Sequence, residues 1–154
     1  MSESSIPVYV IKTNARGDTL WTRTYAEGSK WKTANGIRQT NDGGYIITGF
    51  VLPLDETTKK LYLLKIGRQG EVEWERIFDG KGEEARGYSV IQTDNGFAVV
   101  GSTGGDVYFI KTNNEGLITA VSEENSPYLP QNFVLSQNYP NPFNPNTTIS
   151  FDIV

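Results

Sequence analysis

The sequence contains neither cysteine nor histidine, and methionine occurs once among its 154 residues. Without thiols, the chain can form no disulfide, no thiolate metal site and no cysteine nucleophile. Without imidazole, it lacks the most common general base of enzymes and a common ligand of transition metals. These absences exclude Ser-His and Cys-His catalysis. We therefore expect a protein that is not an enzyme, with no catalytic residue, no metal and no other cofactor.

Positive charge and long apolar runs are also scarce. Lys and Arg number 14 against 18 Asp and Glu, which gives a net charge of −4, and the basic residues are scattered along the chain. Because a nucleic-acid site needs clustered basic residues, we expect no nucleic-acid partner. No apolar run approaches the roughly 18 residues of a membrane span, so we expect none. The N-terminal stretch MSESSIPVYV lacks the basic and apolar regions of a signal peptide.

What the sequence does contain is internal repetition. Three segments align without gaps: VYVIKTNARGDTLWTRTY from Val8, LYLLKIGRQGEVEWERIF from Leu61 and VYFIKTNNEGLITAVSEE from Val107. Each has an apolar strand, a polar turn with glycine and a second strand, which is the pattern of a β-hairpin. The second residue of each copy is a tyrosine: Tyr9, Tyr62 and Tyr108. Each segment is therefore predicted to be one copy of a repeated hairpin.

A second pair of similar segments lies between these hairpins. ANGIRQTNDGGYIITGF begins at Ala34, and ARGYSVIQTDNGFAVVGS begins at Ala85. Their turns, rich in Asp, Asn and Gly, tolerate positive φ and connect neighbouring antiparallel strands. Hairpin plus hairpin predicts a four-stranded repeat of roughly 40 to 50 residues, which is the period of propeller blades.

The repeat also resembles a known family. The combination of Q-T-x-D-G-G-Y-I-I-x-G with x-Y-L-I-K-T-x-x-x-G-x-x-x-W is similar to a β-propeller repeat frequent in secreted bacterial and archaeal surface proteins, over about residues 8–124. The resemblance implies an all-β fold of antiparallel four-stranded blades. We expect a partial propeller over residues 1–124, with a hairpin at 8–25 and blades at 33–78 and 86–121.

Two blades and a hairpin do not close a ring, because complete propellers have about four to eight blades. We therefore predict an incomplete ring. Three explanations stay open: a fragment of a longer protein, a truncated form, or a chain that closes its ring by self-association.

The C-terminal composition differs from that of the repeats. Residues 125–132 have the composition of a polar linker, and NFVLSQNYPNPFNPNTTISFDIV follows. This stretch resembles the start of the type A sorting domain of the type IX secretion system, over about residues 133–154. The resemblance implies a truncated sorting-domain start, a secreted or cell-surface location and the secretion machinery as a partner. The matching motif residues are Asn138, Tyr139, Pro140, Asn141, Pro142, Phe143, Asn144 and Pro145.

Proline fixes φ and removes a hydrogen-bond donor, so this Pro/Asn-rich tail is predicted to be extended and separate from the blades. The segment from Thr148 to Val154 alternates like a strand. Since it lacks the partners of a complete sorting domain, we expect it to be disordered or to pair with the edge of another sheet.

Aromatic residues are the first candidates for ligand contact. Trp31 lies in the less regular stretch GSKWKT and is the candidate ligand-contact residue, because an exposed indole can stack on a glycan or a protein partner. Trp21 and Trp74 each follow the hairpin glycine by four residues, and Ala120 takes that position in the third copy. Because they recur at the repeat period, we interpret them as packing residues, with a carbohydrate platform as the alternative.

Carboxylates are the second group of candidates. Asp42, Asp94 and Asn95 lie in glycine-rich turns, where turn formation is the simpler interpretation and calcium ligation the alternative. Six acidic residues allow a glycosidase-like pair: Asp18, Glu71, Glu73, Glu75, Glu83 and Glu84. Strand alternation puts Glu71, Glu73 and Glu75 on one face, for which a solvated outer strand is the simpler interpretation.

Two functions follow as hypotheses. The first is a non-enzymatic binding or adhesion module for a protein or glycan partner. The alternative is a structural module whose incomplete blades complete one another in a homo-oligomer.

Overall fold

A computed structural model of the protein describes residues 5–119, 133–135 and 151–153. The chain divides into two compact units, Met1–Thr119 and Ala120–Val154. In the first unit, nine antiparallel strands form three sheets, which confirms the predicted all-β class. The described parts of the chain contain no helix that is long and apolar enough to cross a membrane.

The three sheets have simple meander orders. The first pairs β1 with β2, the second has the order β3-β4-β5-β6, and the third has the order β7-β8-β9. The strand bounds are β1 (Val8–Thr13), β2 (Thr19–Tyr25), β3 (Ser29–Gln39), β4 (Tyr45–Pro53), β5 (Lys60–Ile66), β6 (Val72–Phe78), β7 (Ala85–Thr93), β8 (Gly96–Thr103) and β9 (Asp106–Asn113).

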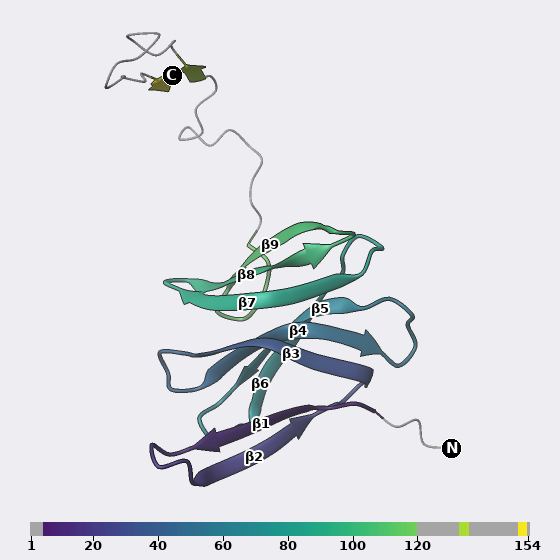
Figure 1. The fold of residues 1–154 in the computed structure, drawn as a ribbon, viewed down its shortest axis with the longest axis vertical. Coiled ribbons are helices and arrows are strands. Elements are labelled where there is room, and N and C mark those ends of the chain that lie inside the picture. The colour runs from purple at the N-terminus through teal and green to yellow at the C-terminus, as the bar shows by residue number, and fades with distance from the viewer. Residues whose placement is uncertain (1–4, 120–132, 136–150, 154) are drawn as a thin grey trace, which may run out of the picture. The chain divides into compact units, whose positions relative to one another are not determined.

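Within the first unit, the sheet β3–β6 lies between the other two (Figure 1). Its strands β4 and β5 are apolar on both faces and bury both, as predicted for a sheet with neighbours on either side. One core lies between this sheet and the hairpin β1–β2 and contains Val8, Tyr25, Ile47, Val51, Tyr62, Leu64 and Ile66. A second core, shared with β7–β9, contains Ile46, Leu61, Leu63, Phe78, Ala85, Val90, Phe97, Val99 and Ile110.

The strand register repeats between the second and third sheets. Tyr62 on β5 pairs with Gly49 on β4, and Tyr108 on β9 pairs with Gly101 on β8 in the same way. Both glycines are required by close packing, because a Cβ at either position would collide with a backbone carbonyl of the adjoining strand. The tyrosines that align in the sequence therefore occupy equivalent positions in the two sheets.

In the described residues, the third sheet shows three of the four strands expected for the blade over residues 86–121. It has three strands, and its only further pairing in the described residues is a bridge between Thr112 and Ile118, followed by a hydrogen bond from Thr119 N to Lys111 O. The rest of the expected fourth strand, from residue 120 on, lies outside the described residues. In the sequence, Ala120 takes the position of the tryptophan of the other copies.

The expectation for the C-terminal strand also needs a correction. Phe151–Ile153 (β11) pairs antiparallel with Phe133–Leu135 (β10), in the register Phe133 with Ile153. We expected this segment to have no partner of its own. In the structure, it pairs with β10 inside the second unit. The sorting motif from Asn138 to Pro145 lies outside the described residues.

Candidate interaction surfaces

A recurring contact joins each sheet to the next. The indole of Trp21 on β2 lies against Gly70, in the turn of the following sheet, and Trp74 on β6 lies against Gly116 in the same manner. Both glycines have positive φ, 82° and 75°, and a Cβ on either would meet the indole ring. These positions agree with the interpretation of both tryptophans as packing residues between repeats.

Hydrogen bonds and ring contacts reinforce this junction between β2 and the second sheet. The Nε1 of Trp21 donates to Arg68 O at 3.1 Å, and the hydroxyl of Tyr25 donates to Gly70 O at 2.7 Å. The Trp21 ring also meets Tyr45 edge-on, with ring centroids 6.3 Å apart. Trp74 meets Phe97 in the same way at 5.7 Å, so the contact has the same chemistry at both junctions.

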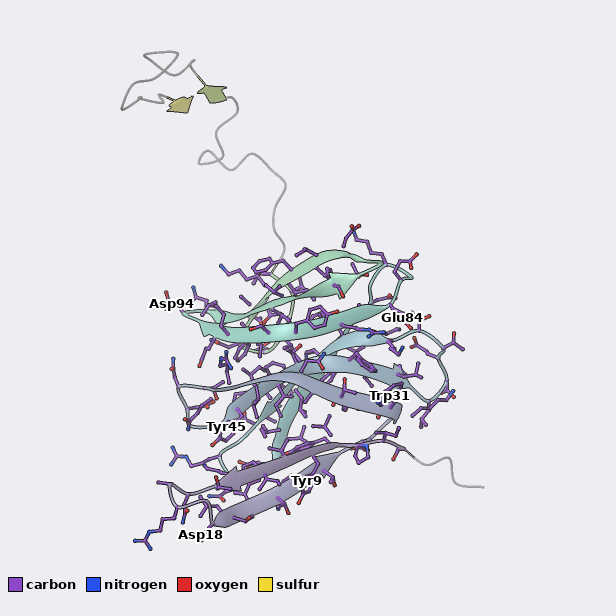
Figure 2. The ribbon with its side chains drawn as sticks, in the orientation of Figure 1. Tyr9, Asp18, Trp31, Tyr45, Glu84 and Asp94 are labelled. Atoms are coloured by element: carbon purple, nitrogen blue, oxygen red, sulfur yellow. The ribbon has the colours of Figure 1, made fainter. Side chains whose placement is uncertain are left out.

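The outer face of the hairpin is exposed in the described part of the chain. Tyr9 is 58% exposed, whereas Tyr62, its equivalent in the next repeat, is completely buried. Ile11 and Leu20 lie on the same face as Tyr9 and are also exposed. On the opposite side, the core between the hairpin and the central sheet covers Val8 and Val10, which alternate with them. Figure 2 shows Tyr9 on this outermost hairpin.

The outer face of the third sheet is exposed as well. Val107 is 82% exposed, and Phe109, two residues along the same face of β9, is also exposed. Ile110 points the other way, into the core shared with the central sheet. Val100 on β8 and Ile91 on β7 extend this apolar face. The described part of the first unit thus has an open apolar face at each end of its three sheets.

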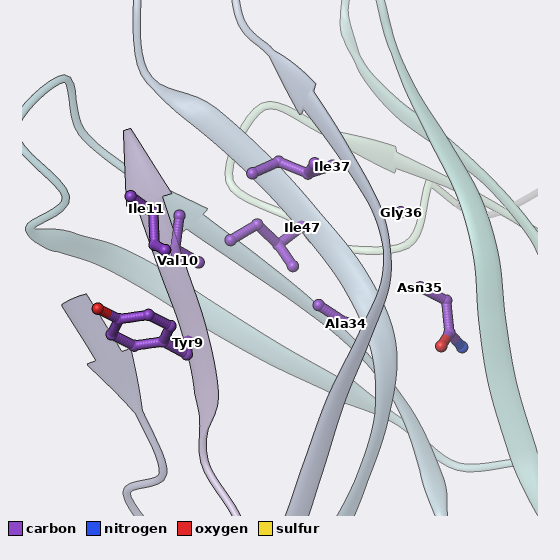
Figure 3. A pocket seen from close by; sticks show the side chains of 8 residues that line it. All are labelled: Tyr9, Val10, Ile11, Ala34, Asn35, Gly36, Ile37 and Ile47. Carbon is purple, nitrogen blue, oxygen red and sulfur yellow. The ribbon is translucent and has the colours of Figure 1, made fainter. Parts of the chain in front are cut away.

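A hollow lies along β1, next to β3 and β4 (Figure 3). It has a volume of about 290 Å³, and its lining is mostly apolar: Tyr9, Val10, Ile11, Ala34, Asn35, Gly36, Ile37 and Ile47. A second hollow of about 190 Å³ continues it, sharing Val10, Ile11 and Ile37 and reaching Trp21 and Tyr45. Together they form one groove, which we call the β1 groove.

Trp31, the candidate ligand contact, lies on β3 and is 39% exposed. Its ring packs edge-on against Phe50, with centroids 5.3 Å apart, and the Nζ of Lys59 lies 5.6 Å from the centre of the indole. The guanidinium group of Arg86 lies 5.2 Å from the centre of the Phe50 ring, and both Lys59 and Arg86 pair with Glu84. The hydrogen bond from Arg86, and then that from Lys59, lowers the pKa of the Glu84 carboxyl. Phe50 and the Lys59 cation therefore cover part of the indole, and 39% of the Trp31 surface remains exposed.

The acidic residues of β6 are paired with lysines of the central sheet. The Nζ of Lys32, a buried side chain on β3, lies 2.6 Å from Glu75 and 5.1 Å from the centre of the Tyr62 ring. Burial raises the pKa of Tyr62, and its hydroxyl has no hydrogen-bond partner in the described part of the chain. The expectation of a solvated acidic face was therefore incomplete, because Glu75 neutralises a buried ammonium group.

Lys65 makes the second such pair. Its Nζ lies 2.8 Å from Asp42 and 3.1 Å from Glu73, which links the β3–β4 turn to β6. Burial alone would lower the pKa of Lys65, but its hydrogen bonds to the two carboxylates outweigh burial and raise it. The hydrogen bond from Lys65 in turn holds the pKa of Asp42 well below its usual range. Asp42 is thus a turn and pairing residue.

The described residues hold no group of three or more acidic residues placed to bind a metal ion. Sequence reasoning did not identify the β1 groove or the Lys32–Glu75 pair.

No protein-family model matches the chain, and no curated protein is significantly similar to it.

Proposed function

We propose that the protein is a non-enzymatic, secreted or cell-surface module of the β-propeller type that binds a protein or glycan partner. One observation carries this proposal: the apolar face of the third sheet, with Val107 and Phe109, is open in the described part of the chain. Large exposed apolar faces are uncommon on monomeric proteins and mark interaction sites.

The repeat pattern supports the propeller-type architecture. Consecutive sheets share one register, and each junction uses a tryptophan over a turn glycine, as in a stack of equivalent blades. The resemblance of residues 133–154 to a type IX sorting-domain start supports the surface location and the secretion machinery as a partner. Trp31 is the aromatic side chain that we assign to ligand contact.

Binding to immobilised glycans and to purified extracellular matrix proteins tests this function. We expect saturable binding to a member of one of these panels. Val107→Asp should weaken it at least tenfold if the open face of β9 makes the contact, and Trp31→Ala should do so if the indole makes it. No binding by the wild-type chain to either panel, or binding unchanged in both variants, would contradict the proposal.

Self-assembly is the second candidate function, and Gly17 favours it. Gly17 is the equivalent of Gly70 and Gly116, but no described heavy atom outside its own neighbours would lie within 4 Å of a Cβ there. The position that a preceding tryptophan would cover is therefore open. Covering a face of several hundred Å² would contribute several kcal/mol to association, at about 25 cal/mol per Å². Under this alternative, copies of the chain complete one another in a homo-oligomer.

A further inference from the structure

We propose that the free edge of β1 is a strand-acceptor site, at which a strand of another polypeptide with the apolar pattern of β4 adds to the sheet β1–β2. The partner is an extended segment that pairs antiparallel with β1 and places an apolar side chain in the β1 groove. This inference rests on the proposed binding function and names the chemistry of one partner.

The first step of the inference is the equivalence of β1 and β5. Val8–Thr13 aligns with Leu61–Ile66, and each strand pairs on one side with the second strand of its hairpin. On its other side, β5 pairs with β4 over seven residues, from Tyr45 to Val51. In the described part of the chain, β1 belongs to a two-stranded sheet and has no such neighbour. An unpaired edge of this kind accepts a strand by main-chain hydrogen bonding.

The second step is the burial of the facing sheet. Ile37 on β3 aligns with Val90 on β7, yet Ile37 is 42% exposed and Val90 only 1%. Val90 is buried in the core that contains Ile46 of β4. The side chain that would cover Ile37 in the same way belongs to a strand equivalent to β4, and no described strand takes that place beside β1. The β1 groove occupies this position, since both of its hollows are lined by Ile37 and Ile11.

The third step is the register. β4 places Gly49 opposite Tyr62, Ile47 opposite Leu64 and Ile46 opposite Lys65. By equivalence, an added strand places a small residue opposite Tyr9 and an apolar residue opposite Ile11. The apolar residue opposite Lys12 corresponds to Ile46 and enters the groove above Ile37. The acceptor site thus selects an alternating apolar strand with a glycine or another small residue at one defined position.

The experiment uses a fluorescent peptide with the sequence of residues 43–54, extended by lysines at both ends for solubility. Fluorescence anisotropy follows its binding to the full chain, and amide hydrogen exchange of β1 follows the site. We expect saturable binding that protects β1 amides. We also expect Ile37→Asp in the protein, or Ile46→Asp in the peptide, to weaken it at least tenfold. Leu117→Asp, a change at an exposed position in the turn after β9 and outside both open faces, is the matched control and should leave the affinity unchanged.

Three results would overturn the inference: no saturable binding, binding without protection of β1, or equal affinities for the Ile37→Asp protein and the wild type. Far-ultraviolet circular dichroism of the Ile37→Asp protein tests whether it is folded. We expect it to be folded, because Ile37 is partly exposed. The peptide assay involves neither glycans nor matrix proteins. A negative peptide result alongside binding in those panels therefore removes the strand-acceptor site and leaves the proposed function standing.

Discussion

The indole of Trp21 lies over Gly70, a turn glycine of the next repeat with φ of 82°. The same relationship joins Trp74 to Gly116. A glycine is needed in each turn for two separate reasons: the left-handed backbone conformation and the space that the indole takes up. Gly17 also has a left-handed backbone conformation, with φ of 90°. A Cβ added there would meet no described neighbour, so the space at Gly17 is not restricted by an indole.

This difference predicts unequal costs for the same substitution. Gly17→Ala should lower the free energy of unfolding by about 1 kcal/mol, the typical cost of a left-handed conformation for a residue with a side chain. Gly70→Ala should cost about 2–4 kcal/mol, because the methyl group also displaces Trp21. Urea unfolding of both variants measures the difference. Equal losses in the two variants would show that the indole does not pack on Gly70.

The Lys32–Glu75 pair predicts that replacing either partner alone lowers the free energy of unfolding by unequal amounts. Glu75→Gln should lower the free energy of unfolding by about 2–4 kcal/mol, because it leaves the buried Lys32 ammonium without its counter-charge. Lys32→Met should cost less, since Glu75 is 27% exposed and can be hydrated. The double variant Lys32→Met/Glu75→Gln should be more stable than Glu75→Gln alone. Chemical denaturation measures all three, and additive losses would contradict the pairing.

The turn residue Asp42 predicts a dependence of stability on pH. The Lys65 hydrogen bond lowers the pKa of Asp42 in the folded state, so its contribution is fully present above the unfolded pKa of about 3.9 and is lost as pH falls through the folded pKa. Asp42→Asn should therefore lower stability at neutral pH by about 0.5–1 kcal/mol, a modest effect because Asp42 is more than half exposed. The difference from wild type should shrink in strong acid.

Asp94, in the corresponding turn of the third sheet, provides the control for this prediction. No ion pair of Asp94 occurs among the described residues, so Asp94→Asn should change stability by less than about 0.5 kcal/mol. Thermal unfolding at several pH values measures both variants. An Asp42→Asn effect that stays constant down to the most acidic pH would rule out the pairing as its cause.

The division of the chain predicts the effect of removing the tail. Both apolar cores lie within the unit Met1–Thr119, so deletion of residues 126–154 should leave that unit folded. We expect the melting temperature to change by less than about 4 °C, which corresponds to under 1 kcal/mol for a domain of this size. Calorimetry of the full and shortened chains measures the change. A much larger loss would make the tail part of the folded core.

The sequence predicted the repeated hairpins well because their signals are local. The turn glycines and the apolar strands YIITGF and YLLKI fix the strands and the register between them. The third hairpin was the exception. Its polar turn is intact, and a bridge at Ile118 follows, but the described residues end at Thr119, before the expected strand is complete.

The features that sequence reasoning missed depend on contacts across several strands. Lys32 reaches Glu75 from the opposite edge of a four-stranded sheet, and no spacing in the sequence indicates that pair. The β1 groove exists because a strand equivalent to β4 is not beside β1 in the described residues. The repeat pattern indicates which strand would pair with β1. The shape and lining of the groove in its place depend on how the strands pack in the folded chain.

The most direct test of the central claim, that the open apolar faces are interaction surfaces, combines light scattering with binding of a hydrophobic dye. Across a dilution series, the wild-type chain should either form a discrete oligomer or bind the dye as a monomer. The double variant Ile11→Asp/Val107→Asp should lose both properties, because each change places a carboxylate on one open face. A wild-type chain that stays monomeric at every concentration and binds no dye would contradict the claim.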